Sequence, residues 1–528
     1  MRELVVKCTT FRDGVQAEGV EVTDLKGTLM AIKAIDRLGV RYHEVGFALA
    51  SEVIRERIRE AMNLELSGKV AAFGRTHPAD VSAMLELQVP VAVFVGKTRA
   101  NDVIKVIRRS NLDENLKLIH DSVSALAKSG AEVIYDAEHL FQALFEDDRS
   151  YALQTLEAAL NAGAGWIVLC DTNGKMSPEK ITEAINIVKT VIPAKHLGIH
   201  THNDRGRAVV NAETAFLHGV SLVEGTIGGV GERTGNLDLC TLLPNLVVEY
   251  GAQGISPEQL AWLTETYLLV CDVLNVAPRN NNPWVGGAAF YTEAGMHESG
   301  NERDRGNYLH ADPALVGNRV RVGVTDQSGK ANIVSKAREL GLEIPADKVE
   351  QIALAHQQIV DAGGDFGLAD ASFYLFLLEQ LGQLPTFFDF VSFRAIIEKH
   401  ADRSVSTEAS LRLVLDGEPK LHNADGDGPV NALDEVLRRT LRRKYPELMA
   451  VRLEDYKVRI VDASRGTAAK IRVRIEFTDG AKSWCTCAVH ENIIEASWDA
   501  LLQAYIYKLV SNGHPRFGAS VAEVPAAS

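Results

Sequence analysis

Cysteine is scarce in this sequence: the 528 residues include six cysteines, and only Cys485 and Cys487 lie close together. Six are too few for a disulfide scaffold, and the close pair falls in a strand-like run where residues i and i+2 point the same way. Long hydrophobic runs are missing too, since the apolar run 89–95 is far shorter than the ~18–20 residues of a membrane helix. Residues 1–7 lead into a predicted strand without the apolar region of a signal peptide. We therefore expect a cytoplasmic protein with reduced thiols and no membrane partner.

Positive charge is in the minority, with 56 Lys and Arg residues against 70 Asp and Glu and a formal net charge of −14. Because nucleic-acid backbones and anionic membranes repel such a chain, nucleic acid is not an expected partner. Disorder is excluded as the dominant state, because 46% hydrophobic and 24% charged residues are typical of a large folded core. The length predicts two or three domains.

One repeating unit fills the first 250 residues: an apolar β-rich run, a polar turn and a segment of helical period. The apolar residues of 25–38 recur every three or four positions, and Ser177 followed by Pro178 is a typical helix start. The eight β-rich runs are residues 4–8, 40–45, 70–73, 91–95, 132–135, 166–170, 197–202 and 222–227. Eight βα units predict an α/β fold, a closed (β/α)8 TIM barrel over residues 1–254, with an open doubly wound sheet as the alternative.

The rest of the chain divides into two predicted parts. Residues 255–402 are helical with a loop-rich middle, which predicts a helical connector. Residues 403–528 contain an internal repeat, in which the helix starts 428–437 and 492–501 lie 64 residues apart. The alternating strands that precede these helices are 410–415 and 420–424, then 456–461, 469–477 and 483–489. Two strand–strand–helix copies predict a pseudo-symmetric α+β domain, either a ligand sensor or a dimerisation module.

Polar side chains gather where the predicted strands end, which is where a TIM barrel carries its chemistry. Six of the eight strand ends have such groups: Arg12, Asp13 and Gln16; Glu44; Asp136 and Glu138; residues 171–174; residues 200–204; and residues 231–236. This concentration predicts an enzyme.

The pair His200 and His202 is the first candidate for chemistry, because residues two apart on a strand face one side. Alone, such a pair is more often structural. With Asp13 and Asn236 on neighbouring strand ends, it favours a metal site. Two nitrogens with carboxylate and amide oxygens suit Mn²⁺, Mg²⁺, Co²⁺ or Zn²⁺, and the donor set does not choose among them.

Other polar residues at the barrel mouth have two interpretations each. Arg12 can hold an oxyanion beside the metal or form a surface salt bridge. Glu138 and Glu232 are candidates for acid–base or supporting groups, and Glu232 can instead form a buried structural pair with Arg233. Thr172 can bind a carboxylate or cap a helix.

Two later segments say less by themselves. His297, in the segment 295–300 (GMHESG), is by position an ordinary loop histidine. The glycine-bearing segment 323–330 (GVTDQSGK) is not a P-loop, because no Ser or Thr follows Lys330, so nucleotide hydrolysis is not expected.

Together these motifs resemble the Claisen-condensing acyltransferases of the isopropylmalate, homocitrate and citramalate synthase family, over nearly the whole chain. The segments that carry the resemblance are 9–16 (TTFRDGVQ), 200–204 (HTHND), 231–236 (GERTGN), Tyr308 with 312–317 (DPALVG), 466–470 (GTAAK) and 492–497 (NIIEAS). Segments 133–139 (VIYDAEH) and 168–174 (VLCDTNG) look most like the citramalate branch.

The resemblance implies a role for each candidate residue. The metal ligands would be Asp13, His200, His202 and Asn236, with the ion chelating the keto and carboxylate oxygens of a 2-oxo acid. Arg12 would stabilise the alkoxide and Glu138 would act near the substrate, which Gln16, Glu44 and Thr172 would bind. His297, helped by Tyr308 and Glu232, would deprotonate the methyl group of acetyl-CoA.

The resemblance also implies a pathway and a control. In the citramalate branch the 2-oxo acid is pyruvate, thioester hydrolysis makes the condensation irreversible, and the product feeds isoleucine synthesis. The C-terminal domain would then be regulatory, sensing isoleucine and pairing in a homodimer.

The sequence departs from the family pattern without losing a proposed ligand. Cys8 stands where Asp is usual, segment 44–48 (EVGFA) lacks a proline, and Thr292 with Glu293 replaces a His-Lys pair. Arg205 and Arg207 occupy positions that are commonly small or apolar. We hypothesise that one of these arginines meets an additional anionic group on CoA or on a larger substrate; the alternative is a solvated arginine at a helix N-terminus.

The sequence leaves three alternatives to this function. Another family member would make isopropylmalate, homocitrate or a related 2-alkylmalate. The related barrel lyase that cleaves hydroxymethylglutaryl-CoA uses a cysteine loop near the last strand, whereas segment 229–236 has no cysteine. A catalytically silent amino-acid sensor is disfavoured by the intact set of candidate ligands and catalytic residues.

Overall fold

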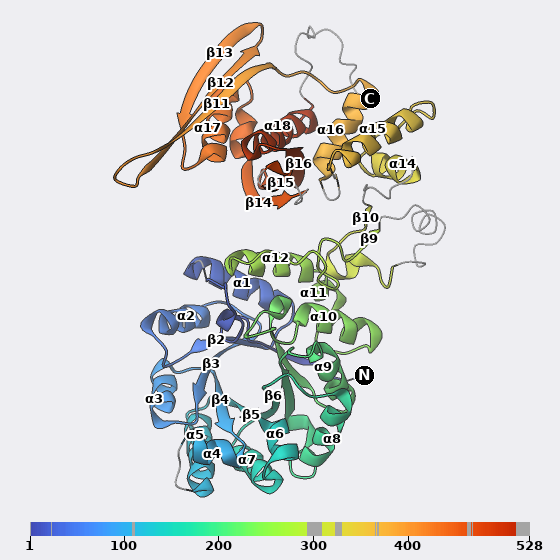
Figure 1. Ribbon diagram of the computed structural model, residues 1–528. Coiled ribbons are helices and arrows are strands. Elements are labelled where there is room, and N and C mark those ends of the chain that lie inside the picture. The colour runs from blue at the N-terminus through green and yellow to red at the C-terminus, as the bar shows by residue number, and fades with distance from the viewer. Residues whose placement is uncertain are drawn as a thin grey trace. The chain divides into compact units, whose positions relative to one another are not determined.

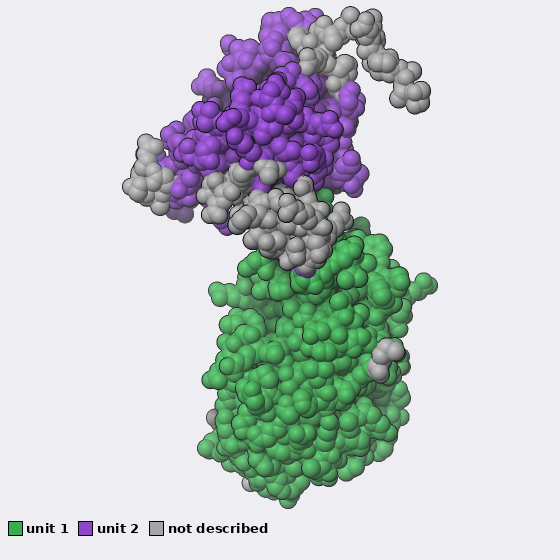
Figure 2. All heavy atoms as spheres, turned by 90° about the vertical axis from the view of Figure 1, so that its right-hand side faces the viewer, with its two compact units in different colours: residues 1–290, 310–320 green, residues 291–309, 321–528 purple. Residues whose placement is uncertain are grey.

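The computed structural model describes residues 2–22, 24–107, 111–292, 309–322, 330–364, 366, 369–461, 466 and 468–513. They form two compact units, which Figure 2 colours green (residues 1–290 and 310–320) and purple (residues 291–309 and 321–528). The candidates His297 and Tyr308 lie outside the described residues, so their roles stay predictions.

Eight parallel strands form a closed barrel in the first unit, in chain order (Figure 1). The strands are β1 (Val5–Cys8), β2 (Tyr42–Phe47), β3 (Lys69–Arg75), β4 (Val91–Lys97), β5 (Glu132–Glu138), β6 (Trp166–Asp171), β7 (Leu197–Thr201) and β8 (Leu222–Gly225). Strand β8 pairs back onto β1, with Leu222 opposite Val5, so the sheet has no free edge. Each predicted run coincides with one strand, which confirms the barrel and excludes the open sheet.

Helices follow the strands and surround the barrel (Figure 1). They are α1 (Leu25–Arg37), α2 (Glu52–Met62), α3 (Pro78–Leu87), α4 (Ala100–Lys105), α5 (Leu112–Lys128), α6 (Leu140–Glu146), α7 (Arg149–Asn161), α8 (Pro178–Val188), α9 (Ala208–Leu217), α10 (Leu239–Pro244), α11 (Pro257–Leu260) and α12 (Leu263–Val273). Helix α8 begins as predicted, with the Ser177 side chain accepting from the Lys180 amide and Pro178 in the first turn. Helix α12 packs on α1, so the unit extends past residue 254.

The barrel interior changes from apolar to charged along the strands. Its apolar layer includes Val5, Tyr42, Ile134 and Leu222. Because inward-facing residues recur every second position, the next inward layer holds Lys7, Glu44, Asp136 and Glu224. All four of these charged residues are buried. The charged end is the C-terminal end of the strands, where the candidate residues were expected.

Residues 310–320 return to the barrel unit after the chain has entered the second unit. Their attachment is made by hydrogen bonds to the backbone. The Thr264 hydroxyl donates to the Val316 carbonyl (2.6 Å), and the Asn318 amide donates to the Trp284 carbonyl (2.8 Å). This return segment is therefore an integral part of the barrel unit.

The second unit contains two copies of a three-stranded antiparallel sheet followed by a helix. The first copy is β11 (Asp389–Lys399), β12 (Val405–Leu415), β13 (Glu418–Asp425) and α17 (Pro429–Leu441); the second is β14 (Arg452–Ile460), β15 (Ile471–Thr478), β16 (Ser483–His490) and α18 (Ile493–Ser511). Helix α17 packs on the first sheet and α18 on the second. The predicted repeat and both predicted helix starts are confirmed.

Strand β11 was not predicted. It pairs antiparallel with β12, so the break expected at 402–403 falls in the turn between these two strands. Most of its side chains are exposed, and it lacks the apolar–polar alternation that marks the other strands. The internal repeat offered the missing signal, because the second copy was predicted with three strands and the first with two.

Between the barrel unit and the repeat, the chain is helical with a two-stranded parallel ribbon. The elements are β9 (Tyr291–Thr292), β10 (Arg321–Val322), α14 (Lys330–Glu339), α15 (Val349–Asp361) and α16 (Asp370–Leu381). Among the described residues, no helix combines the length and the apolar content that a membrane span requires.

Replacing Trp498 with Ala should destabilise the second unit by about 3–5 kcal/mol, since a large buried side chain leaves a cavity. Trp498 is 2% exposed on α18, and its ring lies 5.1 Å from that of Phe393 on β11. Differential scanning calorimetry of the full chain should show a lowered transition. The conservative W498F should lose much less, and an equal loss in both variants would contradict the packing argument.

Candidate active site

A cavity of about 620 Å³ opens at the C-terminal ends of the barrel strands. Eight of the candidate residues line it: Arg12, Asp13, Gln16, Glu138, Thr172, His200, His202 and Glu232. Glu44 and Asn236 lie beside it without lining it. The barrel therefore brings together, in one place, side chains that are as much as 220 positions apart in the sequence.

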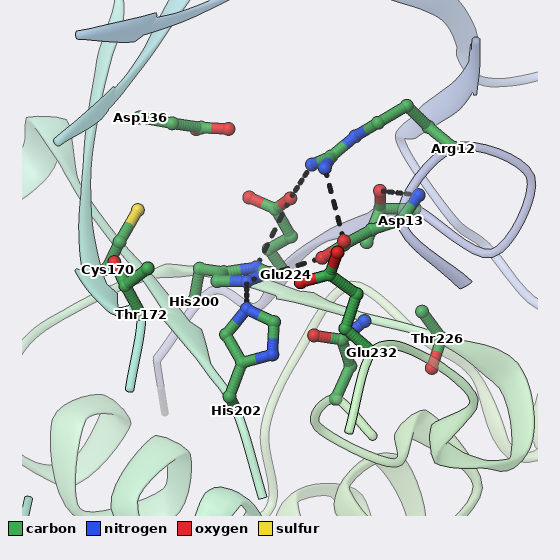
Figure 3. A network of polar contacts seen from close by, with 12 residues as sticks. Arg12, Asp13, Asp136, Cys170, Thr172, His200, His202, Glu224, Thr226 and Glu232 are labelled. Atoms are coloured by element: carbon green, nitrogen blue, oxygen red, sulfur yellow. Dashed lines mark hydrogen bonds and ion pairs between the residues drawn. The ribbon is translucent and has the colours of Figure 1, made fainter. Parts of the chain in front are cut away.

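Asp13, His200 and His202 form a buried cluster in which one donor atom from each residue lies within 4.8 Å of the others. The two Nε2 atoms are 3.1 Å apart, and Nε2 of His200 is 3.5 Å from Oδ2 of Asp13 (Figure 3). Burial and the neighbouring His200 lower the pKa of His202 to about 3, so its ring is neutral, the form that binds metals. Three convergent donors of this kind fit a divalent ion.

Asn236 adds a fourth donor next to this cluster. It is 2% exposed and is the antiparallel bridge partner of His202. Its Nδ2 donates to the Val230 carbonyl, whereas its buried Oδ1 has no hydrogen-bond partner among the described residues. A Cβ on Gly231 would lie 2.3 Å from that Nδ2, so glycine is needed for the amide to fit. A buried carbonyl oxygen without a hydrogen-bond partner, such as Oδ1 of Asn236, is available to coordinate a metal ion.

The turn after β1 positions Arg12 and Asp13. Its backbone is tightened by Thr9, whose carbonyl accepts from the amides of residues 12, 13 and 14. Thr10 ties the turn to the opposite side of the loop, since its hydroxyl accepts from the Ile227 amide (2.9 Å). Both threonines are fully buried. The Thr-Thr pair of the opening motif is therefore a structural anchor for the two residues that follow it.

Arg12 is held on three sides. Its Nε and Nη2 donate to the two carboxylate oxygens of Glu44 at 2.9 and 3.3 Å, and Nη1 is 3.3 Å from Asp13. The guanidinium also lies over the Phe73 ring, 4.2 Å from its centre. Glu44 itself is 1% exposed and does not line the cavity. The neighbouring strands β1 and β2 bring Glu44 onto Arg12, which gives it a supporting position, and its contact with substrate stays a prediction.

Lys7 lies at the centre of the charged layer, with no exposed surface. Its Nζ is 2.9 Å from Glu224, 3.2 Å from Asp136 and 3.5 Å from Glu44. Burial by itself would lower the pKa of Lys7, but the three carboxylates outweigh burial and raise it. The lysine is therefore charged and neutralises carboxylates from three other strands.

Glu224 connects this lysine to the metal-capable cluster. Its second oxygen lies 3.4 Å from Nδ1 of His200, on the far side of the ring from the atom that faces Asp13. Burial would raise the pKa of Glu224, but Lys7 and His200 hold it below its ordinary value. A carboxylate in this position orients a histidine ligand and makes it more basic.

Asp136 completes the charged layer and lines the cavity. Burial and the neighbouring Glu224 raise its pKa to about 7, although Lys7 opposes the shift. The carboxyl group lies across the site from Arg12, on the side of Cys170 and Thr172 (Figure 3).

The remaining candidates lie on the cavity wall. Thr172 Oγ1 accepts from the His139 amide (2.9 Å), which leaves its own hydrogen to donate. Glu138 pairs with Lys97 (2.6 Å). Glu232 lines the cavity and lies 3.4 Å from Arg233, but both side chains are exposed, so the pair is not the buried one expected; the acid–base role of Glu232 stays a prediction.

Known proteins match the chain over nearly its whole length. The signature of the HMGL-like family covers residues 5–266, and that of the LeuA allosteric (dimerisation) domain covers residues 367–509. An (R)-citramalate synthase from Aquifex aeolicus (strain VF5) is 39% identical over 516 residues, which are 96% of this chain and 97% of the relative. This chain belongs to the citramalate synthase family. Two further (R)-citramalate synthases, from Geobacter sulfurreducens and Synechocystis sp., are 38% and 36% identical over 95% of this chain and 96% and 95% of the relatives.

Sequence reasoning missed part of the site of this citramalate synthase family member. Lys7 and Glu224 were read only as members of strand runs, and Asp136 was noticed without a role. A charged residue within a strand of a closed barrel has to find a partner inside it, which is the signal that could have identified Lys7 and Glu224.

Arg205 and Arg207, by contrast, lie outside the cavity. Both side chains are exposed, and Arg205 donates to the Lys175 carbonyl (3.2 Å). Arg207 is the residue before α9 and makes no capping bond through its side chain. Their positions agree with solvated arginines at a helix N-terminus, and the proposed contact with an anionic group stays a hypothesis.

Proposed function

We propose that this chain is an (R)-citramalate synthase, a transferase that condenses acetyl-CoA with pyruvate to give citramalate and CoA for isoleucine synthesis. The observation that carries the proposal is its 35–39% identity to five (R)-citramalate synthases along nearly the full chain. The cavity supports the proposal, because it places a cluster of potential metal ligands beside Arg12 and the hydroxyl group of Thr172. An arginine can stabilise an oxyanion, and a hydroxyl donor can bind a carboxylate.

Asp13, His200 and His202 would hold a divalent metal ion, Mn²⁺, Mg²⁺, Co²⁺ or Zn²⁺, with Asn236 as a further ligand. The convergent donor atoms and the unpaired Asn236 oxygen support this assignment. When bound, such an ion polarises the keto group of the 2-oxo acid as a Lewis acid. Glu224 holds the His200 ring in the orientation that presents Nε2 to the site.

The other residues would bind and orient the two substrates. Arg12, held by Glu44, would stabilise negative charge on the keto oxygen as the new carbon–carbon bond forms. Thr172 would donate to the pyruvate carboxylate, and Gln16 and Glu138 would contact the substrate from the cavity wall. Removal of a proton from the methyl group of acetyl-CoA would fall to His297, with Tyr308 and Glu232 assisting.

Replacing Arg12 with Lys should lower kcat about 10²–10³-fold, because a point charge cannot keep the two bonds to Glu44 and face the keto oxygen as well. The KM for pyruvate should change much less, since carboxylate binding is assigned to Thr172. Steady-state kinetics with varied pyruvate separates the two parameters. Arg41→Lys, at an exposed site outside the cavity, is the matched control. A kcat for R12K within threefold of the wild-type value would show that Arg12 does not stabilise the transition state.

The C-terminal unit would carry assembly and control. Because residues 367–509 match the LeuA allosteric (dimerisation) domain, we propose that the protein forms a homodimer in the cytoplasm and that isoleucine inhibits it through this unit. Light scattering after size exclusion tests the dimer, and CoA release with added isoleucine tests the inhibition.

The activity itself is tested by CoA release from acetyl-CoA, detected with a thiol reagent, in metal-loaded protein. The panel of acceptors is pyruvate, 2-oxobutanoate, 2-oxoisovalerate and 2-oxoglutarate. A preference for pyruvate is the expected result. A preference for another acid would move the function to isopropylmalate, homocitrate or another 2-alkylmalate synthesis. No release with any acid, despite bound metal, would favour a silent amino-acid sensor.

A further inference from the structure

Asp136 presents a carboxyl group to the cavity that the proposed chemistry does not use. Its side chain is 6% exposed, and that remaining surface is part of the cavity wall. Behind it lies Lys7, 3.2 Å away. Lys7 therefore holds the carboxyl group on one side, and the group is open only toward the space that the substrates would occupy.

Around Asp136 the buried carboxyl groups outnumber the buried cations Lys7 and Arg12. Glu224 lies 2.9 Å from Lys7, and Glu44 lies 2.9 Å from Arg12, so each cation already has a carboxylate. Asp136 is a further buried carboxyl group beside these pairs, and it adds a desolvation cost. A role toward the cavity explains its presence better than a role in the barrel.

The position of Asp136 relative to the substrate follows from the neighbouring strand. Cys170 and Thr172 are two residues apart at the end of β6, and both line the cavity. Cys170 is the register neighbour of His200 on β7. In Figure 3 Asp136 lies on the same side of the site as Cys170 and Thr172. A 2-oxo acid held at Thr172 by its carboxylate and at the His200 cluster by its keto oxygen would have its side chain next to Asp136.

We propose that Asp136 is a specificity-determining residue, whose carboxyl group restricts the side chain of the 2-oxo acid to the methyl group of pyruvate. The inference rests on the function proposed above. A methyl group is small enough to leave water on the carboxyl group. A longer or branched apolar side chain would displace that water and bury the carboxyl group beside hydrocarbon, which is unfavourable. An acidic side chain, as in 2-oxoglutarate, would place a second carboxyl group against that of Asp136, which makes ionisation of both unfavourable.

The test is the ratio of kcat/KM for 2-oxobutanoate and for 2-oxoisovalerate to that for pyruvate, in wild type, D136A and D136N. D136A should raise both ratios at least about tenfold, because the apolar side chain of the larger substrate no longer has to bury a carboxyl group that lacks a partner. D136N keeps the size of the side chain and removes its ionisable group. Its ratios should rise roughly threefold or more, since an amide is less costly to desolvate than a carboxylate. Asp147→Asn is the matched control: its carboxylate is 8% exposed, pairs with Arg99 and does not line the cavity, so the ratios should stay at the wild-type values.

The outcomes separate this inference from the function on which it rests. The wild-type preferences test the function, and the change between wild type and variant tests Asp136. If a variant that still turns over pyruvate has kcat/KM ratios within twofold of the wild-type ratios, Asp136 does not determine the specificity. Loss of turnover with every acid in both variants, folded and with metal bound, would also overturn it, because Asp136 would then belong to the reacting groups.

Discussion

Replacing His202 with Ala is expected to lower metal affinity at least about 100-fold and CoA release at least about 10³-fold. The reason is geometric: the ring supplies one of three donor atoms that converge within 4.8 Å, and its neutral form is already favoured by burial. No other described His, Cys, Asp or Glu completes a cluster of three in its place. Isothermal titration with Mn²⁺ and the thiol-reagent assay measure the two effects on the same preparation.

A matched control distinguishes the loss of a ligand from the loss of any histidine. His120 is exposed on α5, pairs with Asp121 and does not line the cavity, so H120A should bind metal and release CoA like the wild type. If H202A kept full metal affinity and lost only turnover, His202 would act on the substrate and the ligand assignment would be wrong. If it kept both, the cluster would have no catalytic role.

Replacing Lys7 with Met should destabilise the barrel unit by about 3–5 kcal/mol, because it leaves three buried carboxylates without their shared cation. These carboxyl groups would then hold protons more tightly in the folded than in the unfolded chain. The folded state binds more protons in that case, so the stability of K7M should fall as pH rises through neutrality. Thermal unfolding followed by circular dichroism at pH 6 and pH 8 measures both the loss and its pH dependence.

The double variant Lys7→Met with Glu224→Gln provides the control for this prediction. Removing the carboxylate nearest to Lys7 should recover part of the loss, so the two changes should be less than additive. Strict additivity would show that the stability of the barrel does not depend on this ion pair. A K7M protein as stable as the wild type at pH 8 would contradict the whole electrostatic account.

The sequence predicts those elements of the fold whose pattern is contained in a short stretch of neighbouring residues. The eight barrel strands were predictable because a parallel strand that is covered on both faces gives a short apolar run, and each run is followed by a helical pattern. Strand β11 was not, because its exposed residues lack alternation. The same reasoning located Asp13, His200 and His202 at strand ends, which is where the structure has them.

The partners of the site residues were harder to predict, because they come from strands that are distant in sequence. Glu44 was predicted at the end of a strand but lies within β2, and only the neighbouring position of β1 shows that it holds Arg12. Lys7 contacts residues on β2, β5 and β8, and no pattern within β1 identifies them. Register across the closed barrel, not the period within one strand, decides which charges meet.

The return of residues 310–320 to the barrel unit constrains how this protein can be divided or recombined. A single cut at residue 290 would take away a segment whose hydrogen bonds reach Thr264 and Trp284. A catalytic fragment that keeps the barrel unit whole has to continue through Val320 and therefore carries residues 291–309 of the second unit with it. For the same reason, a genetic crossover that leaves the barrel unit whole has to fall after Val320 and not at residue 290.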